Sequence, residues 1–158
     1  PVFKVNPPLR TEEDVLALRA GLADGTIDIV ATDHAPHPGE SKECEWQEAA
    51  FGMVGLEHAL SIVASTMVAS GLMDWSALQD RMSTGPARIG GYGDHGRALE
   101  VGAPAHVIVI NPKATYRVDR DQLLSKSRNT PFHGMEFDAQ VIATFFHGRP
   151  VFENGRTA

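Results

Sequence analysis

The feature that most constrains the fold is an abrupt change in the character of the chain at residue 33. Residues 26–32 are rich in β-branched side chains and predict a short, largely buried strand. The next segment, residues 33–39, contains two prolines and a glycine, which exclude a helix. Asp33, His34 and His37 are therefore expected on a loop at the carboxyl end of a strand, where parallel α/β barrels carry their catalytic groups.

A helix is predicted immediately before this strand, over residues 12–24. Thr11 and Asp14 have the spacing of a capping box, and Gly25 stands where a helix commonly ends. Val15, Leu18 and Leu22 recur at helical spacing, so we expect them on one apolar face.

Further helices are predicted between the loop and Gly91. The apolar spacing predicts a long helix over residues 55–70 that Gly71 ends, and Asp74 and Thr84 are expected to cap helices over 75–83 and 85–90. After Gly91 the pattern becomes strand-like, at residues 107–110, 115–118, 141–146 and 150–152. The order predicts an α/β chain whose last part is a small β region.

Composition excludes several classes of function. The net charge is -6 and the isoelectric point is near 5.6, so no overall positive field favours nucleic acid or an anionic membrane. No apolar run approaches the roughly 18 residues of a spanning helix. Cys44 is the only cysteine, which excludes an internal disulfide. We expect a soluble protein in the cytoplasm.

The loop at residues 33–39 is the best candidate for chemistry. One carboxylate and two imidazoles can bind a metal, move a proton or hold an anion. Asp33, His34 and His37 could furnish three zinc ligands, although Pro36 constrains the backbone between them. Taken alone, the Asp33–His34 pair favours a hydrogen-bonded structural role.

Three motifs taken together indicate a resemblance to one protein family. Residues 4–10, 31–37 and 51–57, in this order and spacing, closely resemble the class I bacterial dihydroorotases of the amidohydrolase superfamily. Residues 127–132 and 148–151 fit the same C-terminal pattern, so the resemblance covers essentially the whole chain. It implies the C-terminal part of a (β/α)8 TIM-type barrel over residues 1–91. Residues 92–158 would then be a small β region belonging to a composite β-sandwich domain.

The resemblance also implies an activity. Enzymes of this family reversibly interconvert N-carbamoyl-L-aspartate and L-dihydroorotate in de novo pyrimidine biosynthesis, and they depend on zinc, with two ions expected in the complete enzyme. By position, Asp33 is similar to the catalytic aspartate, which also touches a zinc ion. Its carboxylate would take a proton from the attacking water and deliver it to the leaving nitrogen.

Four further residues match substrate-binding positions of the family. His37 resembles the ligand of the substrate carboxylate, Asn6 a substrate-contacting asparagine, and Phe51 with Gly52 a pair that contacts substrate through the chain. Each has a simpler reading, with Asn6 as a turn residue, Phe51 as core and Gly52 as a bend. His34 is expected to orient the loop, and Arg10 to form a supporting ion pair.

Most of the metal-binding residues expected for the family are missing from this sequence. It contains no His-x-His pair, and a closed barrel takes about 250 residues. We therefore expect the C-terminal portion of a longer chain, inactive by itself. Two alternatives stay open: a related cyclic amidase (dihydropyrimidinase, hydantoinase or allantoinase), or a non-catalytic subunit that assembles with aspartate transcarbamoylase. A homodimer is also expected as a form of assembly, and residues 40–48 could be a mobile flap or a solvated loop.

Overall fold

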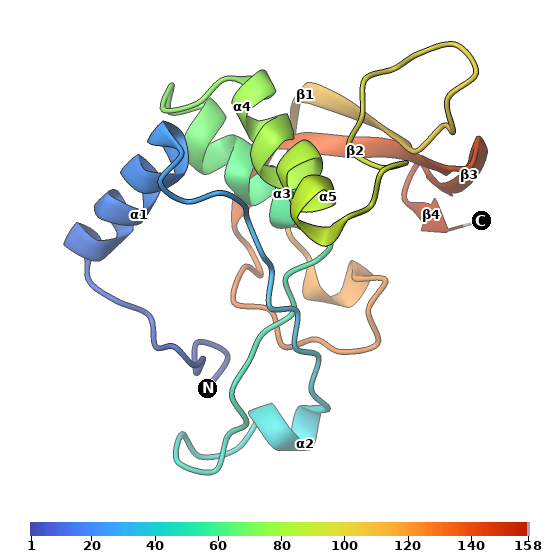
Figure 1. Cartoon of the computed structure of the whole chain (residues 1–158). Coiled ribbons are helices and arrows are strands. Elements are labelled where there is room, and N and C mark those ends of the chain that lie inside the picture. Colours follow the sequence, from blue (N-terminus) through green and yellow to red (C-terminus); the bar gives the residue numbers. More distant parts are fainter. Residues whose placement is uncertain (158) are drawn as a thin grey trace.

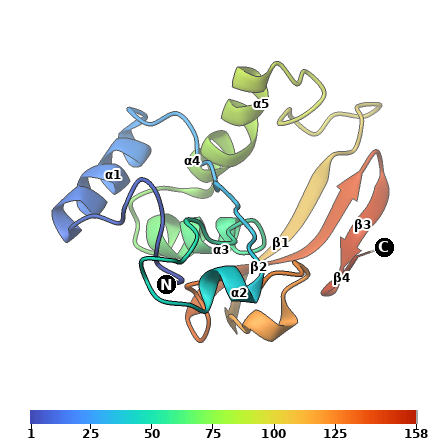
Figure 2. The ribbon, with the colours of Figure 1, turned by 90° about the horizontal axis from the view of Figure 1, so that it is seen from below.

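The computed structural model describes residues 1–157 and places a group of helices beside an antiparallel sheet (Figures 1 and 2). The first helix, α1, spans Glu12–Asp24, as predicted. The backbone N–H and the hydroxyl of Thr11 both donate to Asp14 Oδ2, at 3.2 and 2.9 Å, and Gly25 ends the helix with φ 91°. Local capping therefore sets both ends of α1.

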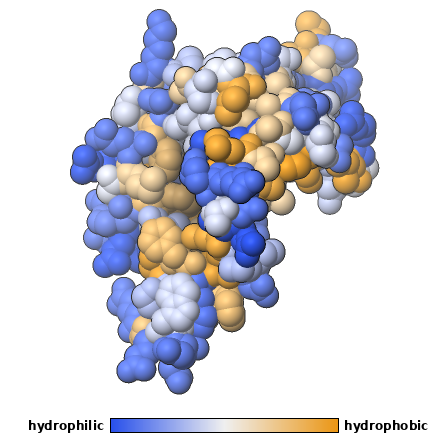
Figure 3. All heavy atoms as spheres, turned by 90° about the vertical axis from the view of Figure 1, so that its left-hand side faces the viewer, coloured by the Kyte–Doolittle hydropathy of each residue, from blue (hydrophilic) through white to orange (hydrophobic). Residues whose placement is uncertain are grey.

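The apolar face predicted for α1 is only partly covered within this chain: Val15 and Leu22 are half-buried, with Leu22 against the core, and Leu18 is exposed. No residue of the helix is buried, and Leu16 and Leu18 are more than half exposed. Figure 3 views the side of the molecule that carries α1 and shows hydrophobic residues exposed among hydrophilic ones. Exposed apolar surface of this kind typically contacts another polypeptide.

The strand predicted over residues 26–32 is absent, and the prediction was wrong for the described residues. The segment runs as coil from α1 toward α2 (Figure 1), and its nearest ladder contact is a single parallel bridge between His34 and Met53. Two backbone bonds hold it, from Ile27 N to Gly21 O and from Val30 N to Arg81 O. A strand requires a hydrogen-bonded neighbour, and residues 1–157 place none beside this segment.

The long helix predicted over residues 55–70 is confirmed in a shorter form. It comprises α3 (Ala59–Val63) and a π-helical continuation, η1 (Ala64–Val68), and Gly71 follows with φ 77°. The residues before it, Gly55 and Leu56, donate their backbone N–H groups to His34 Nδ1.

Residues 75–90 form one continuous helical run in place of the two predicted helices. It consists of α4 (Trp75–Gln79), the π-helical η2 (Asp80–Thr84) and α5 (Gly85–Gly90). Asp74 caps α4 as predicted, by accepting from Ala77 N at 2.8 Å. Thr84 is not a cap, because its backbone is helical and its hydroxyl donates to Gly96 O.

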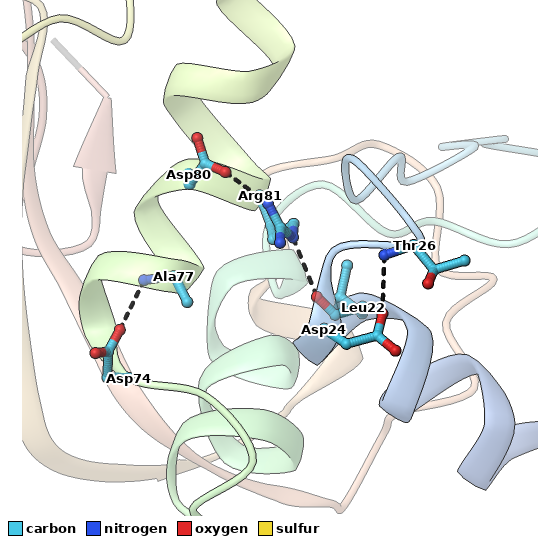
Figure 4. A network of polar contacts seen from close by, with 7 residues as sticks. All are labelled: Leu22, Asp24, Thr26, Asp74, Ala77, Asp80 and Arg81. Atoms are coloured by element: carbon cyan, nitrogen blue, oxygen red, sulfur yellow. Dashed lines mark hydrogen bonds and ion pairs between the residues drawn. The ribbon is translucent and has the colours of Figure 1, made fainter.

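A polar contact joins this helical run to α1 (Figure 4). Arg81 Nε donates to the carbonyl oxygen of Leu22 at 3.1 Å, and its guanidinium pairs with the neighbouring Asp80. Beside it, Asp24 accepts from Thr26 N at 2.8 Å, and this bond holds the pKa of Asp24 below its usual value. The C-terminal end of α1 is therefore fixed against η2.

The sheet has four antiparallel strands in the order β1-β2-β3-β4. They are β1 (Val107–Arg117), β2 (Glu136–Phe146), β3 (Arg149–Glu153) and β4 (Arg156–Thr157). The segments predicted at 107–110 and 115–118 belong to one strand, whose register shifts between Asn111 and Thr115. Short helical turns form α2 (Gly39–Lys42) and η3 (Arg120–Gln122).

The core lies between the helices and β2. Its buried side chains come from α3, η1, the α4 region and the strand: Val63, Ala64, Met67, Met73, Leu78 and Ala139. Ser61 Oγ also donates to Ala139 O at 2.6 Å, which ties α3 to the strand. The mixed α/β class is confirmed, while the domain boundary after Gly91 stays a prediction. Among residues 1–157, no helix has both the length and the apolar character needed to cross a membrane.

Candidate functional site

The side chain of His34 anchors the loop that carries Asp33. The imidazole Nδ1 accepts hydrogen bonds from Gly55 N at 3.0 Å and Leu56 N at 3.3 Å. Ala35 N donates to Met53 O at 2.9 Å, so residues 34–35 run beside residues 53–56. The structure thus gives His34 the orienting role expected from the sequence.

Asp33 itself is exposed and has a strained backbone. Its φ is 45°, in the left-handed region that residues other than glycine rarely adopt. Aspartate and asparagine tolerate this conformation better than most residues, and strain of this kind is concentrated at functional sites. The turn presents the carboxylate on the surface, where another part of a protein or a ligand can reach it.

His37, Phe51 and Gly52 lie together, as the sequence predicts. His37 Nε2 is 2.8 Å from the carbonyl oxygen of Phe51, so this nitrogen carries a proton and donates. Gly52 has φ 125°, and a Cβ there would lie 2.5 Å from Ala35 Cβ and 3.2 Å from His37 Nε2. Only glycine allows the two segments to approach this closely.

Asn129 joins these segments, and the sequence analysis did not identify it as a site residue. It is 4% exposed, and its Oδ1 accepts from His37 N at 3.2 Å. Its Nδ2 donates to Ala35 O at 2.9 Å and Gly52 O at 3.4 Å. Asn129 lies within the motif at residues 127–132, which was the only sign in the sequence of a functional role. The motif does not predict which backbone groups the side chain binds.

Two buried lysines fasten residues 46–52. Lys42 is 2% exposed, and its Nζ donates to Ala50 O at 2.8 Å and Gly52 O at 2.9 Å. Lys4 Nζ donates to Trp46 O and Gln47 O and lies 4.7 Å from the centre of the Phe51 ring. Burial, and secondarily the charge of Lys4, lowers the pKa of Lys42. Part of the segment predicted as a flap or solvated loop is therefore pinned by its backbone carbonyls.

The remaining predicted residues lie at the surface. Phe51 is 56% exposed, so the alternative reading of Phe51 as a core residue is wrong. Asn6 is exposed and its side chain makes no hydrogen bond to other residues in the range 1–157. Arg10 pairs with Asp14 at 3.5 Å, in an exposed ion pair as predicted.

The described residues do not fit a complete metal site. Within residues 1–157, no three His, Cys, Asp or Glu side chains are placed to hold a metal ion. His34 Nδ1 and His37 Nε2 are already engaged with the backbone, so neither is free at that nitrogen to bind zinc. The second ring nitrogens, His34 Nε2 and His37 Nδ1, make no hydrogen bond within residues 1–157, but they and the Asp33 carboxylate are not placed as a set of three around one ion.

Sequence comparison finds relatives of one family over nearly the whole chain. The model of the amidohydrolase family matches residues 5–151. A dihydroorotase from Streptomyces coelicolor is 54% identical over 156 residues, and one from Mycobacterium tuberculosis is 49% identical over 155 residues. These alignments cover 99% and 98% of this chain. The chain spans 36% of the length of each relative.

Solved structures show the same fold. L-hydantoinase (dihydropyrimidinase) from Arthrobacter aurescens matches 100% of this chain and 36% of its own length, with a TM-score of 0.93 and 32% identity. Dihydropyrimidinase from Brevibacillus agri NCHU1002 matches 98% of this chain and 34% of its own, with a TM-score of 0.90. Its identity of 24% supports likeness of fold alone.

Proposed function

The chain belongs to the amidohydrolase family, and on that premise we propose that it is the C-terminal portion of a dihydroorotase. The observation that carries the proposal is the 54% identity to a dihydroorotase across 99% of this chain. The proposed reaction is the reversible hydrolysis of the cyclic amide of L-dihydroorotate to N-carbamoyl-L-aspartate, a step of pyrimidine biosynthesis.

In this reaction Asp33 acts as the acid–base group. Water attacks the ring carbonyl carbon, the carbon–nitrogen bond breaks, and the leaving nitrogen needs a proton. A carboxylate beside the attacking water can accept its proton and pass it to that nitrogen. The exposed position of Asp33 in a left-handed turn supports this role, because the group is held by its backbone and is not buried in contacts of its own.

The substrate carboxylate is proposed to bind at His37. Since Nε2–H is committed to Phe51 O, the second ring nitrogen, Nδ1, is the one available to a ligand. A doubly protonated imidazole would donate Nδ1–H to a carboxylate while keeping its bond to the loop. Gly52 and the exposed Phe51 stand beside this position, and Asn6 completes the proposed set of substrate contacts.

Zinc dependence and the rest of the architecture belong to the same proposal. Two zinc ions would require ligands from parts of the protein outside this sequence, with Asp33 as this chain's contribution. The exposed leucines of α1 and the unpaired residues 26–32 suit a chain that completes a (β/α)8 barrel with further polypeptide, and the sheet would join a composite β-sandwich. A cytoplasmic location, and a homodimer or association with aspartate transcarbamoylase, complete the proposal.

A hydantoinase-like cyclic amidase is the second candidate. The TM-score of 0.93 to L-hydantoinase favours it, but the identity of 32% is well below the 54% to a dihydroorotase. A histidine placed to hold a carboxylate also suits dihydroorotate better than a ring without one. A third reading, a non-catalytic subunit, predicts no turnover of either substrate.

The test is ring opening and closure by the complete protein that contains this chain. We expect turnover of dihydroorotate to exceed turnover of dihydropyrimidine and hydantoin. Asp33→Asn should abolish it, and asparagine is chosen because it tolerates the left-handed backbone. Asp121→Asn, at an exposed position in η3, is the matched control and should behave as wild type. Full activity of Asp33→Asn, or preference for hydantoin, would overturn the proposal.

A further inference from the structure

A small pocket behind His37 carries an excess of positive charge. Its volume is about 170 Å³, and four cationic side chains line it: Lys42, Arg120, Lys126 and Arg128. Glu43 is the one acidic residue of the lining. This local excess runs against the net charge of -6 of the chain, so it does not follow from overall composition.

The acidic residue offsets only one of these cations. Glu43 Oε1 lies 3.8 Å from Arg120 Nη1, in an exposed pair. Within residues 1–157, no carboxylate lies within ion-pair distance of Lys42, Lys126 or Arg128. Lys42 is buried and Arg128 is half-buried, and such charges are normally compensated by an opposite charge, whereas Lys126 is exposed.

The hydrogen bonds of these cations divide them into two roles. Lys42 is buried and its Nζ is fully used by backbone carbonyls, so it contributes charge without a free donor. Arg128 donates through Nη1 to the carbonyl oxygens of Leu123, Ser125 and Ser127. Its Nε and Nη2 make no hydrogen bond within residues 1–157, and neither does Lys126 Nζ. These donors are left for a ligand.

We propose that this pocket binds a small oxyanion of the phosphate class, held by Arg128 and Lys126 over the buried charge of Lys42. Its volume lies below the roughly 300–1,000 Å³ of pockets for drug-sized ligands, which limits the occupant to one phosphate group. A planar guanidinium beside an ammonium suits oxygen atoms spread around one centre. The phosphate is either free or the end of a larger molecule that extends into solvent.

This pocket adjoins the proposed reaction site and shares His37 with it. Its lining includes His37 and Asn129 but not Asp33, Phe51 or Gly52. Of the residues assigned to dihydroorotate, His37 alone lines both places, whereas Arg128 and Lys126 belong to the pocket. The inference does not depend on the proposed reaction, and the two can fail independently.

The test is a calorimetric titration of the complete protein with inorganic phosphate at constant ionic strength, with chloride as the replaced anion. Saturable binding of one phosphate per chain is expected. Lys126→Gln should weaken it about tenfold, because a charge-assisted hydrogen bond is lost. Lys113→Gln removes the same charge from an exposed position on β1 and should leave the affinity unchanged.

A second titration with adenosine monophosphate distinguishes the two sources of the phosphate. Tighter binding than inorganic phosphate identifies the terminal group of a larger ligand, and equal or weaker binding identifies the free ion. Absence of saturable binding to either probe overturns the inference, as does an equal affinity in Lys126→Gln and Lys113→Gln. Turnover of dihydroorotate, measured on the same preparations, shows separately whether the proposed function holds.

Discussion

Asn129→Ala is expected to loosen the candidate site without disturbing the distant sheet. The side chain makes two hydrogen bonds of 3.2 and 2.9 Å, to His37 N and Ala35 O, and a longer one to Gly52 O. Alanine leaves His37 N and Ala35 O without a partner, whereas Gly52 O keeps its bond from Lys42 Nζ. Each unsatisfied group costs about 1–3 kcal/mol, and partial access to water reduces the total to about 2–3 kcal/mol.

Hydrogen exchange of the complete protein measures this loss where it occurs. The informative amides are Ala35 N, bonded to Met53 O, and Gly52 N, bonded to Lys4 O, because neither is bonded to Asn129 itself. A loss of about 2–3 kcal/mol in local opening corresponds to exchange faster by roughly 30- to 150-fold. Peptides covering residues 33–39 and 50–55 should report it.

Two controls make this result specific. The amide of Val118, bonded to Met135 O in the sheet region, should exchange as in wild type. Asn111→Ala removes an exposed asparagine that accepts only from Lys113 N, and it should leave residues 33–55 unchanged. If Asn129→Ala leaves the exchange of Ala35 and Gly52 within a factor of two of wild type, the role assigned to Asn129 is wrong.

Three further predictions concern stability. Gly52→Ala should destabilise the complete protein by about 3 kcal/mol or more in urea unfolding, since a Cβ would clash at φ 125°, whereas Gly71→Ala, at φ 77° in open space, should cost only about 1–2 kcal/mol. Lys42→Met should cost about 2–4 kcal/mol by leaving buried carbonyls unpaired, and Lys113→Met should lie within about 0.5 kcal/mol of wild type. Burial lowers the pKa of His58 below the value of 6.5 for a free side chain, so its contribution to stability is fully present above pH 6.5 and is lost as the pH falls below it. In His58→Gln the free energy of unfolding should depend less on pH between pH 7.5 and 5.5, by at most about 1.4 kcal/mol per pH unit in thermal or urea unfolding. If this slope is the same as in wild type, His58 is not the group responsible for it.

Part of the candidate site could be predicted from the sequence. The motifs placed His37, Phe51 and Gly52 together, and the structure shows them in contact. The sequence could not identify Asn129, because its bond to His37 joins residues 92 positions apart. Nor could it show that the amine of Lys42 is buried against carbonyls, since lysine is ordinarily exposed.

What the sequence determined by itself is the local structure. The capping residues Thr11 and Asp14 with Gly25 set the bounds of α1, Asp74 caps α4, and the prolines of residues 33–39 exclude a helix. These outcomes depend on bonds between residues within a few positions of one another, which are the same in any context. Periodicity alone does not specify the partner that a strand or an apolar face requires.

The tertiary structure decided the features that need distant partners. Residues 26–32 have the composition of a strand yet form none, because no neighbouring strand lies beside them in residues 1–157. Leu16 and Leu18 have the character of buried residues yet stay exposed for the same reason. The geometry of the candidate site likewise follows from Asn129 and two buried lysines, because buried polar groups must find partners wherever the fold brings them.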